Sequence, residues 1–427
     1  LEDPIMKASH YDGYARSRTP PIPLLQVPKA SEAYADLNGK YVLLEAAGKP
    51  DEKVALTETT PGSAVPSAPV GERLRLQAGD DRKKLYEIHG KMTDETVRAL
   101  QKQVGAKAAN YAFLRSTMPL GETRPEEHNY PGFAIPFVFY QEHVERNGID
   151  GAIAKLATLE DSQEIKDALL GIQEAIMAGS VDRELMGLIR DQMENRFRGQ
   201  HRIEETAVKM RFRSSSNAED NKDFSGAGLY ESHPAYYAYT KAPAAEYAEQ
   251  EESQRDIPMA IKKVWASVWK AEAYLARERA GIVQETVRMG ILVHPSYRKE
   301  DATGVVFYYG PDDIEIVANK DNENVQNPSV AGLTPEMHRI TTGGNRESDR
   351  SSRYILSGKE VLSAENRAQL LGLIELVAPR FREVYPEQGI QGVDVEFKLM
   401  EVPDGTGEEV DVMMLKQIRP LADRVTP

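Results

Sequence analysis

Cysteine is absent from the 427-residue sequence, and only 2 residues are tryptophan. A chain without cysteine forms no disulfide framework, no thiolate zinc site and no cysteine nucleophile. Long apolar runs are also missing, since no window approaches the roughly 18 uncharged apolar residues that a transmembrane helix needs. We therefore expect no membrane span and a cytoplasmic location. Because the sequence starts at Leu1 rather than Met, an upstream signal peptide that has been trimmed is compatible with it.

Basic charge is in deficit, because 53 Lys and Arg residues stand against 67 Asp and Glu residues, giving a net charge of −14. Such a chain is unsuited to binding nucleic acid through a basic surface that neutralises phosphates. If it handles phosphate groups, it must do so with a few placed cations. Hydrophobic residues make up 41% of the sequence, which is enough for several buried cores and excludes a disordered or fibrous protein.

Common signatures of nucleotide and hydrolase sites are missing too. The sequence has no Gly-x-x-x-x-Gly-Lys-Ser/Thr loop, no His-Glu-x-x-His and no Gly-x-Ser-x-Gly, and Gly226 and Gly228 lack a third glycine at the dinucleotide spacing. The 8 histidines are scattered without a ligand-like pair. Any site must therefore be sought in less familiar patterns.

Periodicity from about residue 92 onward mixes helices with strand pairs. Apolar stripes that follow capping residues predict helices starting after Thr93, Asp182, Asp256 and Ser363, the third running as one stripe to Leu275 and ending at Gly281. Strands are predicted at residues 41–44, 208–212, 287–293 and 303–309. This mixture favours an α+β fold over a doubly wound sheet. Residues 1–100 carry no motif and are expected to be an N-terminal extension or a small accessory domain.

The C-terminal segment predicts a hairpin with one polar face. Residues 393–399 alternate between apolar and polar side chains, and a second alternating strand follows the turn at residues 403–407. A turn centred near residues 405 and 406 would place Glu396 opposite Leu415 and Asp394 opposite Gln417. Two carboxylates on one face suit Mg²⁺, whereas the alternative is a solvated strand face. The side chains expected together are Asp394, Glu396, Gln417 and Arg419, with Asp411, Met413 and Leu415 following the same alternation.

Two further clusters could bind an anion. Residues 211–220 end a predicted strand in arginine and hydroxyl groups, and residues 224–230 add a loop of small residues, so Arg213, Ser214 and the glycines could wrap a phosphate. The alternative is a polar turn with a helix cap. In residues 104–110, Lys107 stands among small residues at the start of a helix and could reach a phosphate. The alternative is an ordinary surface lysine.

Taken together and in order, these segments resemble the N-terminal nucleotide-binding domain of the phosphoenolpyruvate synthase and pyruvate phosphate dikinase family. The resemblance implies an ATP-grasp-like, two-lobed nucleotide-binding domain over residues 101–427, with lobes of roughly 101–250 and 251–427. The segments that carry it are residues 104–110, 131–136, 213–220, 225–230, 262–269, 287–291, 303–307, 394–396 and 417–421.

The resemblance also implies roles for individual residues. Lys107 and Arg213 would hold the phosphates of ATP, and Asp394 and Glu396 would carry Mg²⁺. Arg213, Gln417 and Arg419 are the implied catalytic residues beside the transferring phosphates. The implied nucleotide-binding set is Lys107, Arg213, Ser214, Gly226, Gly228, Met289, Glu396 and Gln417.

Two departures separate this chain from the family pattern. After Phe307 the family usually has Thr-x-Asn-Pro, whereas residues 308–311 read Tyr-Tyr-Gly-Pro, and residues 319–324 replace a Gly-Leu-Gly-Glu stretch. The phosphohistidine motif of the family's swivelling domain is also missing, because residues 343–344 are not followed by Ser-His and only 8 residues follow Arg419. We therefore expect a phosphohistidine-bearing swivelling domain or a separate acceptor protein as partner.

Three hypotheses follow. The first is an ATP- and Mg²⁺-dependent phosphotransferase module that cleaves ATP to AMP and passes the β-phosphate to a histidine or a small acceptor. The second is a non-catalytic, regulatory nucleotide-binding module of the same fold. The third is a fragment of a glucan-type dikinase, which rests on residues 226–230 and would use residues 1–100 as a substrate domain.

Overall fold

The chain divides into two compact units in a computed structural model. We call Val70–Ser296 the helix-rich unit, and Leu1–Pro69 together with Tyr297–Pro427 the sheet-rich unit. The predicted extension over residues 1–100 and the predicted turn at residues 403–407 lie largely outside the described residues. The structure describes residues 41–45, 55–59, 73–79, 82–90, 92–118, 131–159, 161–197, 209–219, 224, 226, 228–237, 256–296, 300–321, 335–341, 346–350, 360–403 and 408–421.

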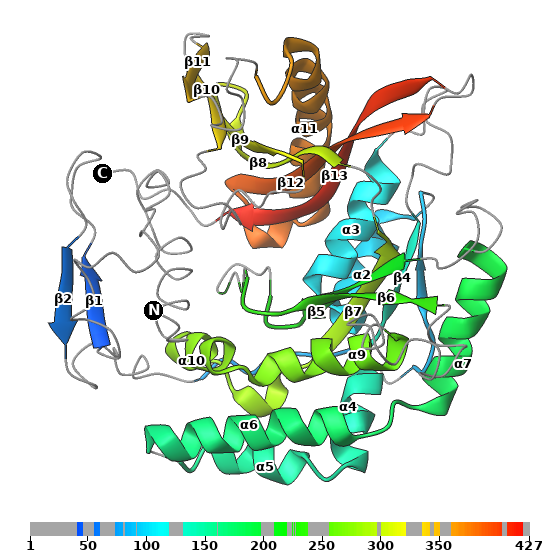
Figure 1. The fold of residues 1–427 in the computed structure, drawn as a ribbon, viewed down its shortest axis with the longest axis vertical. Helices are drawn as coiled ribbons and strands as arrows, with labels where there is room; N and C mark the ends of the chain where they lie inside the picture. Colours follow the sequence, from blue (N-terminus) through cyan, green and yellow to red (C-terminus); the bar gives the residue numbers. More distant parts are fainter. Residues whose placement is uncertain are drawn as a thin grey trace, which may run out of the picture. The chain divides into compact units, whose positions relative to one another are not determined.

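The helix-rich unit is built on a five-stranded sheet in which each described pairing is antiparallel (Figure 1). The predicted strand at residues 208–212 is longer than expected, because the polar residues Ser214 to Ser216 continue its ladder against the central strand. Along the sheet the strands are β3 (Tyr86–Ile88), β4 (Gly132–Ile135), β7 (Met289–Pro295), β5 (Lys209–Ser216) and β6 (Ser232–Tyr236).

Helices pack on this sheet, and several of them begin at a side-chain cap. Thr93, Asp182 and Asp256 accept backbone N–H bonds at the helix starts, which confirms these three predicted caps. The described helices are α2 (Asp94–Val104), α3 (Ala106–Thr117), α4 (Phe137–Arg146), α5 (Asp150–Leu156), α6 (Ser162–Ala178), α7 (Arg183–Gln192) with the π-helix η3 (Met193–Phe197), α9 (Ile257–Ala266) and α10 (Ala271–Arg279), with 3₁₀ turns η5 (Ser267–Trp269) and η6 (Gln284–Thr286).

The helix predicted after Asp256 is interrupted. A single stripe to Leu275 was expected, whereas α9 ends at Ala266 and α10 begins at Ala271. Between them, the Ser267 hydroxyl donates to the carbonyl of Val264, and the buried indole of Trp269 donates to the Tyr140 hydroxyl at 2.9 Å. Satisfying a buried indole N–H in this way turns the chain and overrides the helical period.

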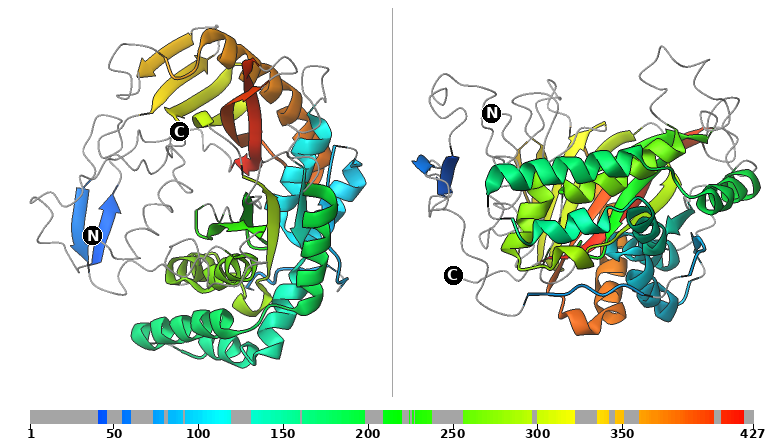
Figure 2. Two further views of the ribbon diagram at one scale, coloured as in Figure 1. Left: turned by 45° about the vertical axis from the view of Figure 1, so that its right-hand side comes forward. Right: turned by 90° about the horizontal axis from the view of Figure 1, so that it is seen from below.

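The sheet-rich unit contains a six-stranded antiparallel sheet backed by one long helix. Helix α11 (Ala364–Val384) starts at the predicted cap Ser363 and packs against the last two strands, as both views of Figure 2 show. A separate hairpin pairs β1 (Tyr41–Glu45) with β2 (Ala55–Thr59). Along the large sheet the strands are β11 (Arg346–Arg350), β10 (Glu336–Thr341), β9 (Asp313–Lys320), β8 (Glu300–Gly310), β12 (Gly392–Pro403) and β13 (Glu409–Leu421), and the 3₁₀ turn η7 is Pro386–Gln388.

The α+β fold class is confirmed, since helices pack on antiparallel sheets in both units. None of the helices described is long and apolar enough to cross a bilayer. The proposed division into an extension over residues 1–100 and a nucleotide-binding domain over residues 101–427, with its two lobes, stays a prediction.

Candidate functional site

The C-terminal hairpin has a different register from the predicted one. Glu396 pairs with Gln417 and Asp394 with Arg419, two residues away from the predicted partners. Nearer the turn, Phe397 pairs with Leu415, so the ladder skips Lys416, which forms a β-bulge. One residue of the difference therefore arises at the turn and the other at the bulge.

The bulge decides which side chains share a face. Opposite residues of an antiparallel pair lie on the same face. Leu415 therefore lies with Phe397, whereas Gln417 and Arg419 lie with Glu396 and Asp394. The prediction that Asp411, Met413 and Leu415 share the polar face was wrong. Without the bulge, strict alternation would place the fully buried Met413 and Leu415 on the carboxylate face.

Helix α11 covers the opposite, apolar face of the hairpin. Its Asn366 side chain donates to Asp411, whose ladder partner Glu401 follows the alternation of Phe397. The apolar face carries Val393, Val395 and Phe397, all fully buried. The helix therefore leaves Asp394, Glu396, Gln417 and Arg419 together on the other face.

Both carboxylates of this polar face are ion-paired. Arg419 donates from Nε and Nη2 to Oδ2 of Asp394 at 2.8 and 2.5 Å, and both side chains are buried. Lys416 donates from Nζ to Oε2 of Glu396 at 2.9 Å, with about a quarter of each side chain exposed. At the bulge, Lys416 and Gln417 together oppose the single residue Glu396, which brings the Lys416 side chain within reach of the Glu396 carboxylate.

The oxygen donors of this face are of the chemical kind that Mg²⁺ binds. The residues described contain no group of three or more His, Asp or Glu side chains able to hold a metal ion. Mg²⁺ is commonly bound through one or two carboxylates and completes its shell with water and substrate phosphates. Asp394 and Glu396, with the amide of Gln417 opposite Glu396, are the residues that would contribute to such a shell.

The second cluster begins at a glycine between two helices of the helix-rich unit. Gly105 ends α2 and precedes α3 with φ of 88°, a conformation that favours glycine. A Cβ atom at this position would lie 2.3 Å from the carbonyl oxygen of Ser215. The backbone of the helix junction thus sits directly on the end of β5, and this contact fixes the start of α3.

Lys107 lies in the first turn of α3 and is buried. Its Nζ donates to the Ser214 hydroxyl at 3.1 Å and forms an ion pair with Oε1 of Glu219. One residue on, the N–H of Ala108 donates to the Ser215 hydroxyl at 2.9 Å. The start of α3 and the end of β5 therefore meet through an ammonium group, hydroxyls and a carboxylate.

Arg213 and Met289 belong to the same sheet end. Arg213 is buried and lies between Ser232 of β6 and Leu292 of β7 in the ladder, and Met289 pairs with Ser216. The following turn is anchored by Asn217, which donates to the carbonyl of Thr286 at 2.9 Å and accepts from the N–H of Arg288 at 2.7 Å.

The two glycines of the predicted anion loop adopt positive φ. Gly226 has φ of 63° and Gly228 has φ of 74°. A Cβ atom on Gly226 would come within 3.3 Å of the Ala218 carbonyl and of Glu219 Cα. Gly226 therefore packs against the turn that carries Glu219. We call Lys107, Ser214, Ser215 and Glu219 the Lys107 cluster. The structure brings Lys107, Ser214 and Gly226 together around Glu219.

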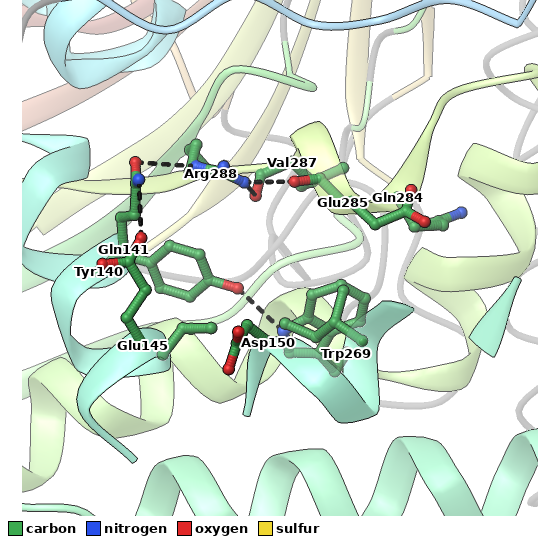
Figure 3. A pocket seen from close by; sticks show the side chains of 11 residues that line it. Tyr140, Gln141, Glu145, Asp150, Trp269, Gln284, Glu285, Val287 and Arg288 are labelled. Atoms are coloured by element: carbon green, nitrogen blue, oxygen red, sulfur yellow. Dashed lines mark hydrogen bonds between the residues drawn. The ribbon is translucent and has the colours of Figure 1, made fainter. Parts of the chain in front are cut away.

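A separate cavity of about 90 Å³ lies between α4, α5 and the 3₁₀ turns of the helix-rich unit (Figure 3). Tyr140 and Trp269 meet there through their hydrogen bond, and burial raises the pKa of Tyr140 to about 12. Ligand pockets for drug-sized molecules usually occupy about 300 Å³ or more. None of the sequence-predicted site residues lines this cavity, and it is too small for a nucleotide.

Two charged residues of these clusters escaped the sequence analysis as site residues. Glu219 was noted only as part of the motif at residues 213–220, and its carboxylate proves to be the partner of Lys107. Lys416 was not singled out at all. The signal for Glu219 was a carboxylate three residues after the serine cluster that ends at Ser216, whereas Lys416 reaches Glu396 only because of a bulge that the alternation of apolar and polar residues does not predict.

The sequence matches a family model described as pyruvate phosphate dikinase, AMP/ATP-binding domain, over residues 101–332. The match covers more than half of the chain. It spans the whole Lys107 cluster and ends before the β12–β13 hairpin.

Proposed function

The chain belongs to the pyruvate phosphate dikinase AMP/ATP-binding domain family, and from this premise we propose that it is an ATP- and Mg²⁺-dependent phosphotransferase module. Its family is one of ATP-binding, kinase-type domains. The finer proposal concerns where the phosphates bind, what holds the metal and which group accepts the phosphoryl group.

The single observation that carries the proposal is the Lys107 cluster inside the matched span. A lysine in the first turn of a helix, next to strand-end hydroxyls, is suited to phosphate oxygens, because the ammonium, the hydroxyls and the helix N-terminus all attract anions. Lys107 and Ser214 already meet at 3.1 Å, and Gly226 lets the loop backbone come close. We assign Lys107, Arg213, Ser214, Gly226 and Gly228 to the phosphates and Met289 to the nucleoside side.

We assign the metal to the polar face of the hairpin. Asp394 and Glu396 would hold Mg²⁺, with Gln417 and Arg419 beside the transferring phosphates. A bound Mg²⁺ would supply charge neutralisation for phosphoryl oxygens. Within the proposal, Arg213 and Arg419 bind and orient phosphate oxygens, and Asp394 holds the Arg419 guanidinium in place through the bonds to Nε and Nη2.

The proposed reaction passes a phosphoryl group from ATP to a histidine or to a small acceptor. Positioning and charge stabilisation supply most of the catalysis in such transfers. The proposed partners are ATP and either a phosphohistidine-bearing swivelling domain or a separate acceptor protein. The ATP-grasp-like, two-lobed arrangement over residues 101–427 is part of the same proposal.

A specific observation favours a second candidate, a non-catalytic nucleotide-binding module. Each carboxylate assigned to the metal already has a cationic partner, Arg419 on Asp394 and Lys416 on Glu396. Residues 308–311 also depart from the family pattern. In this alternative the cluster around Lys107 binds nucleotide without turnover.

The test is nucleotide binding followed by product analysis. Calorimetry with ATP, with and without Mg²⁺, should show binding that weakens in Lys107→Ala and Arg213→Ala. Incubation with ATP, Mg²⁺ and cell extract should then yield AMP rather than ADP. Binding without turnover would favour the non-catalytic module, and no ATP binding under either condition would reject both.

A further inference from the structure

Glu219 holds the position that an anion would take beside Lys107. Its Oε1 forms the ion pair with Lys107 Nζ, and its Oε2 accepts the backbone N–H of Ser216 at 3.5 Å. An ammonium group and a backbone N–H pointing at one acidic group form the kind of donor pair that binds phosphate oxygens. The carboxylate therefore sits among phosphate-type donors.

The backbone around Glu219 is anchored, so the side chain is the part that can leave. The N–H of Ala218 donates to the Ser216 hydroxyl at 3.0 Å, and that hydroxyl donates to the carbonyl of Arg288 at 2.9 Å. Asn217 bonds the segment before β7 on both its oxygen and its nitrogen. A rotation of the Glu219 side chain would free the donors while the turn keeps its place.

Because the Glu219 carboxylate is buried, it would repel an anion that approaches Lys107. Glu219 is 3% exposed and Lys107 is 8% exposed. Two like charges interact more strongly in such surroundings than in water, because the effective dielectric constant is lower. A phosphate group that reached Lys107 with Glu219 in place would meet a second anion on the same ammonium.

We propose that Glu219 is an internal anion that occupies the phosphate position at Lys107, and that a nucleotide phosphate binds there by displacing it. The inference rests on the proposed function, because it takes Lys107 to be a phosphate ligand. Glu219 thus sets how strongly an anion must compete before it enters. A single weakly bound anion would leave the ion pair intact, whereas a polyphosphate, held at several points, would displace the carboxylate.

The test compares wild type with E219Q by calorimetry, using pyrophosphate and ATP as separate probes. The glutamine keeps the shape and an acceptor oxygen while removing the charge. We expect both probes to bind E219Q about tenfold more tightly, because one like charge near the ligand has been removed. The matched control is E278Q, which makes the same charge change in the helix-rich unit at a residue that contacts Arg73 and Gln284 instead. It should leave both affinities unchanged.

The outcomes separate this inference from the proposed function. Equal or weaker binding of both probes by E219Q, or an equal gain in E278Q, would overturn the role of Glu219. If no variant bound ATP while pyrophosphate still bound E219Q more tightly, the proposed function would fail together with the nucleotide as the displacing ligand, and Glu219 would stand as an internal anion that a polyphosphate displaces. If neither probe bound any variant, both ideas would be rejected.

A second variant keeps the test decisive if E219Q does not fold. E219D retains the charge but shortens the side chain by one methylene group, which loosens the contact with Lys107. We expect a smaller gain in pyrophosphate affinity than in E219Q, about threefold. No gain in a folded E219D would count against displacement.

Discussion

The two candidate clusters use the same chemistry but are assembled by different means. At Lys107, the cation comes from a helix start and the carboxylate from a turn more than a hundred residues later in the chain, and a backbone contact at Gly105 fixes their relation. At the hairpin, Arg419 and Asp394 lie on neighbouring strands, and the ladder register alone decides that they meet. The first cluster therefore depends on tertiary packing, and the second on strand pairing.

The largest effect is expected from a change that disrupts the strand pairing between Asp394 and Arg419. Deleting Lys416 removes the bulge, so the residues on one side of it must exchange faces or the hairpin must shift. We expect a loss of about 4 kcal/mol or more in the free energy of unfolding, because Arg419 and Asp394 would be separated and buried unpaired.

The control for the deletion is Lys416→Ala, which keeps the extra residue and removes only the partly exposed ion pair. It should cost less than about 1 kcal/mol. Urea unfolding of both variants measures the difference. Similar losses of unfolding free energy in the two variants would show that the ion pair between Lys416 and Glu396, rather than the strand register, stabilises the part of the hairpin that carries Asp394 and Arg419.

The next largest effect is expected from removing the cation of the buried Lys107–Glu219 ion pair. Lys107→Met leaves the carboxylate of Glu219 buried without its partner, and we expect a loss of about 3 to 5 kcal/mol in unfolding free energy. The double variant Lys107→Met with Glu219→Gln should recover most of this loss, because no buried charge remains unpaired. ATP affinity should stay low in both variants, which separates stability from binding in one series.

A smaller effect sharpens the role of the backbone contact. Gly105→Ala forces a Cβ atom against the Ser215 carbonyl in a positive-φ conformation, and we expect a loss of about 2 to 4 kcal/mol. Gly148→Ala is the matched control, because Gly148 also has positive φ but open space around its Cβ position. It should cost about 1 kcal/mol, as measured by thermal or urea unfolding.

The smallest effect concerns pH. The pKa of Glu231 is lowered to about 2, first by its hydrogen bond with His233 and then by Lys270. A carboxyl with a lowered folded-state pKa stabilises the protein above its ordinary pKa and loses this contribution as the pH falls from about 4.5 toward about 2. Because the Glu231 side chain is 41% exposed, the contribution should stay below about 1 kcal/mol.

The matched measurement is acid unfolding of wild type and Glu231→Gln. The variant should lose stability less steeply between pH 4.5 and 2. An unchanged slope would place the acid sensitivity of this unit elsewhere.

The features that could be predicted from the sequence are those that depend on local residue patterns. The caps at Thr93, Asp182, Asp256 and Ser363 follow from residue type and apolar spacing, and all four are present. The α+β class followed from the mixture of helices and hairpins. The break between α9 and α10 did not, because a tertiary hydrogen bond from Trp269 to Tyr140 competes with a continuous apolar stripe.

The candidate site shows the same division. Lys107 and Ser214 were singled out separately, and their contact depends on a packing of α3 against β5 that no local spacing contains. Asp394, Glu396, Gln417 and Arg419 share a face as predicted although the register differs, because the shifts at the turn and at the bulge add up to two residues and restore the side-chain alternation beyond Lys416. Glu219 as the partner of Lys107 required the three-dimensional arrangement.

The bulge at Lys416 changes which face of the sheet the odd-numbered residues of β13 occupy. Before it, odd-numbered positions of β13 such as Met413 and Leu415 belong to the core, and after it, odd-numbered positions such as Gln417 and Arg419 belong to the candidate site. A substitution at an odd-numbered position before Lys416 therefore changes the core, whereas one at an odd-numbered position after Lys416 changes the candidate site. If the bulge moved by one position, different side chains would enter the site without any change in composition.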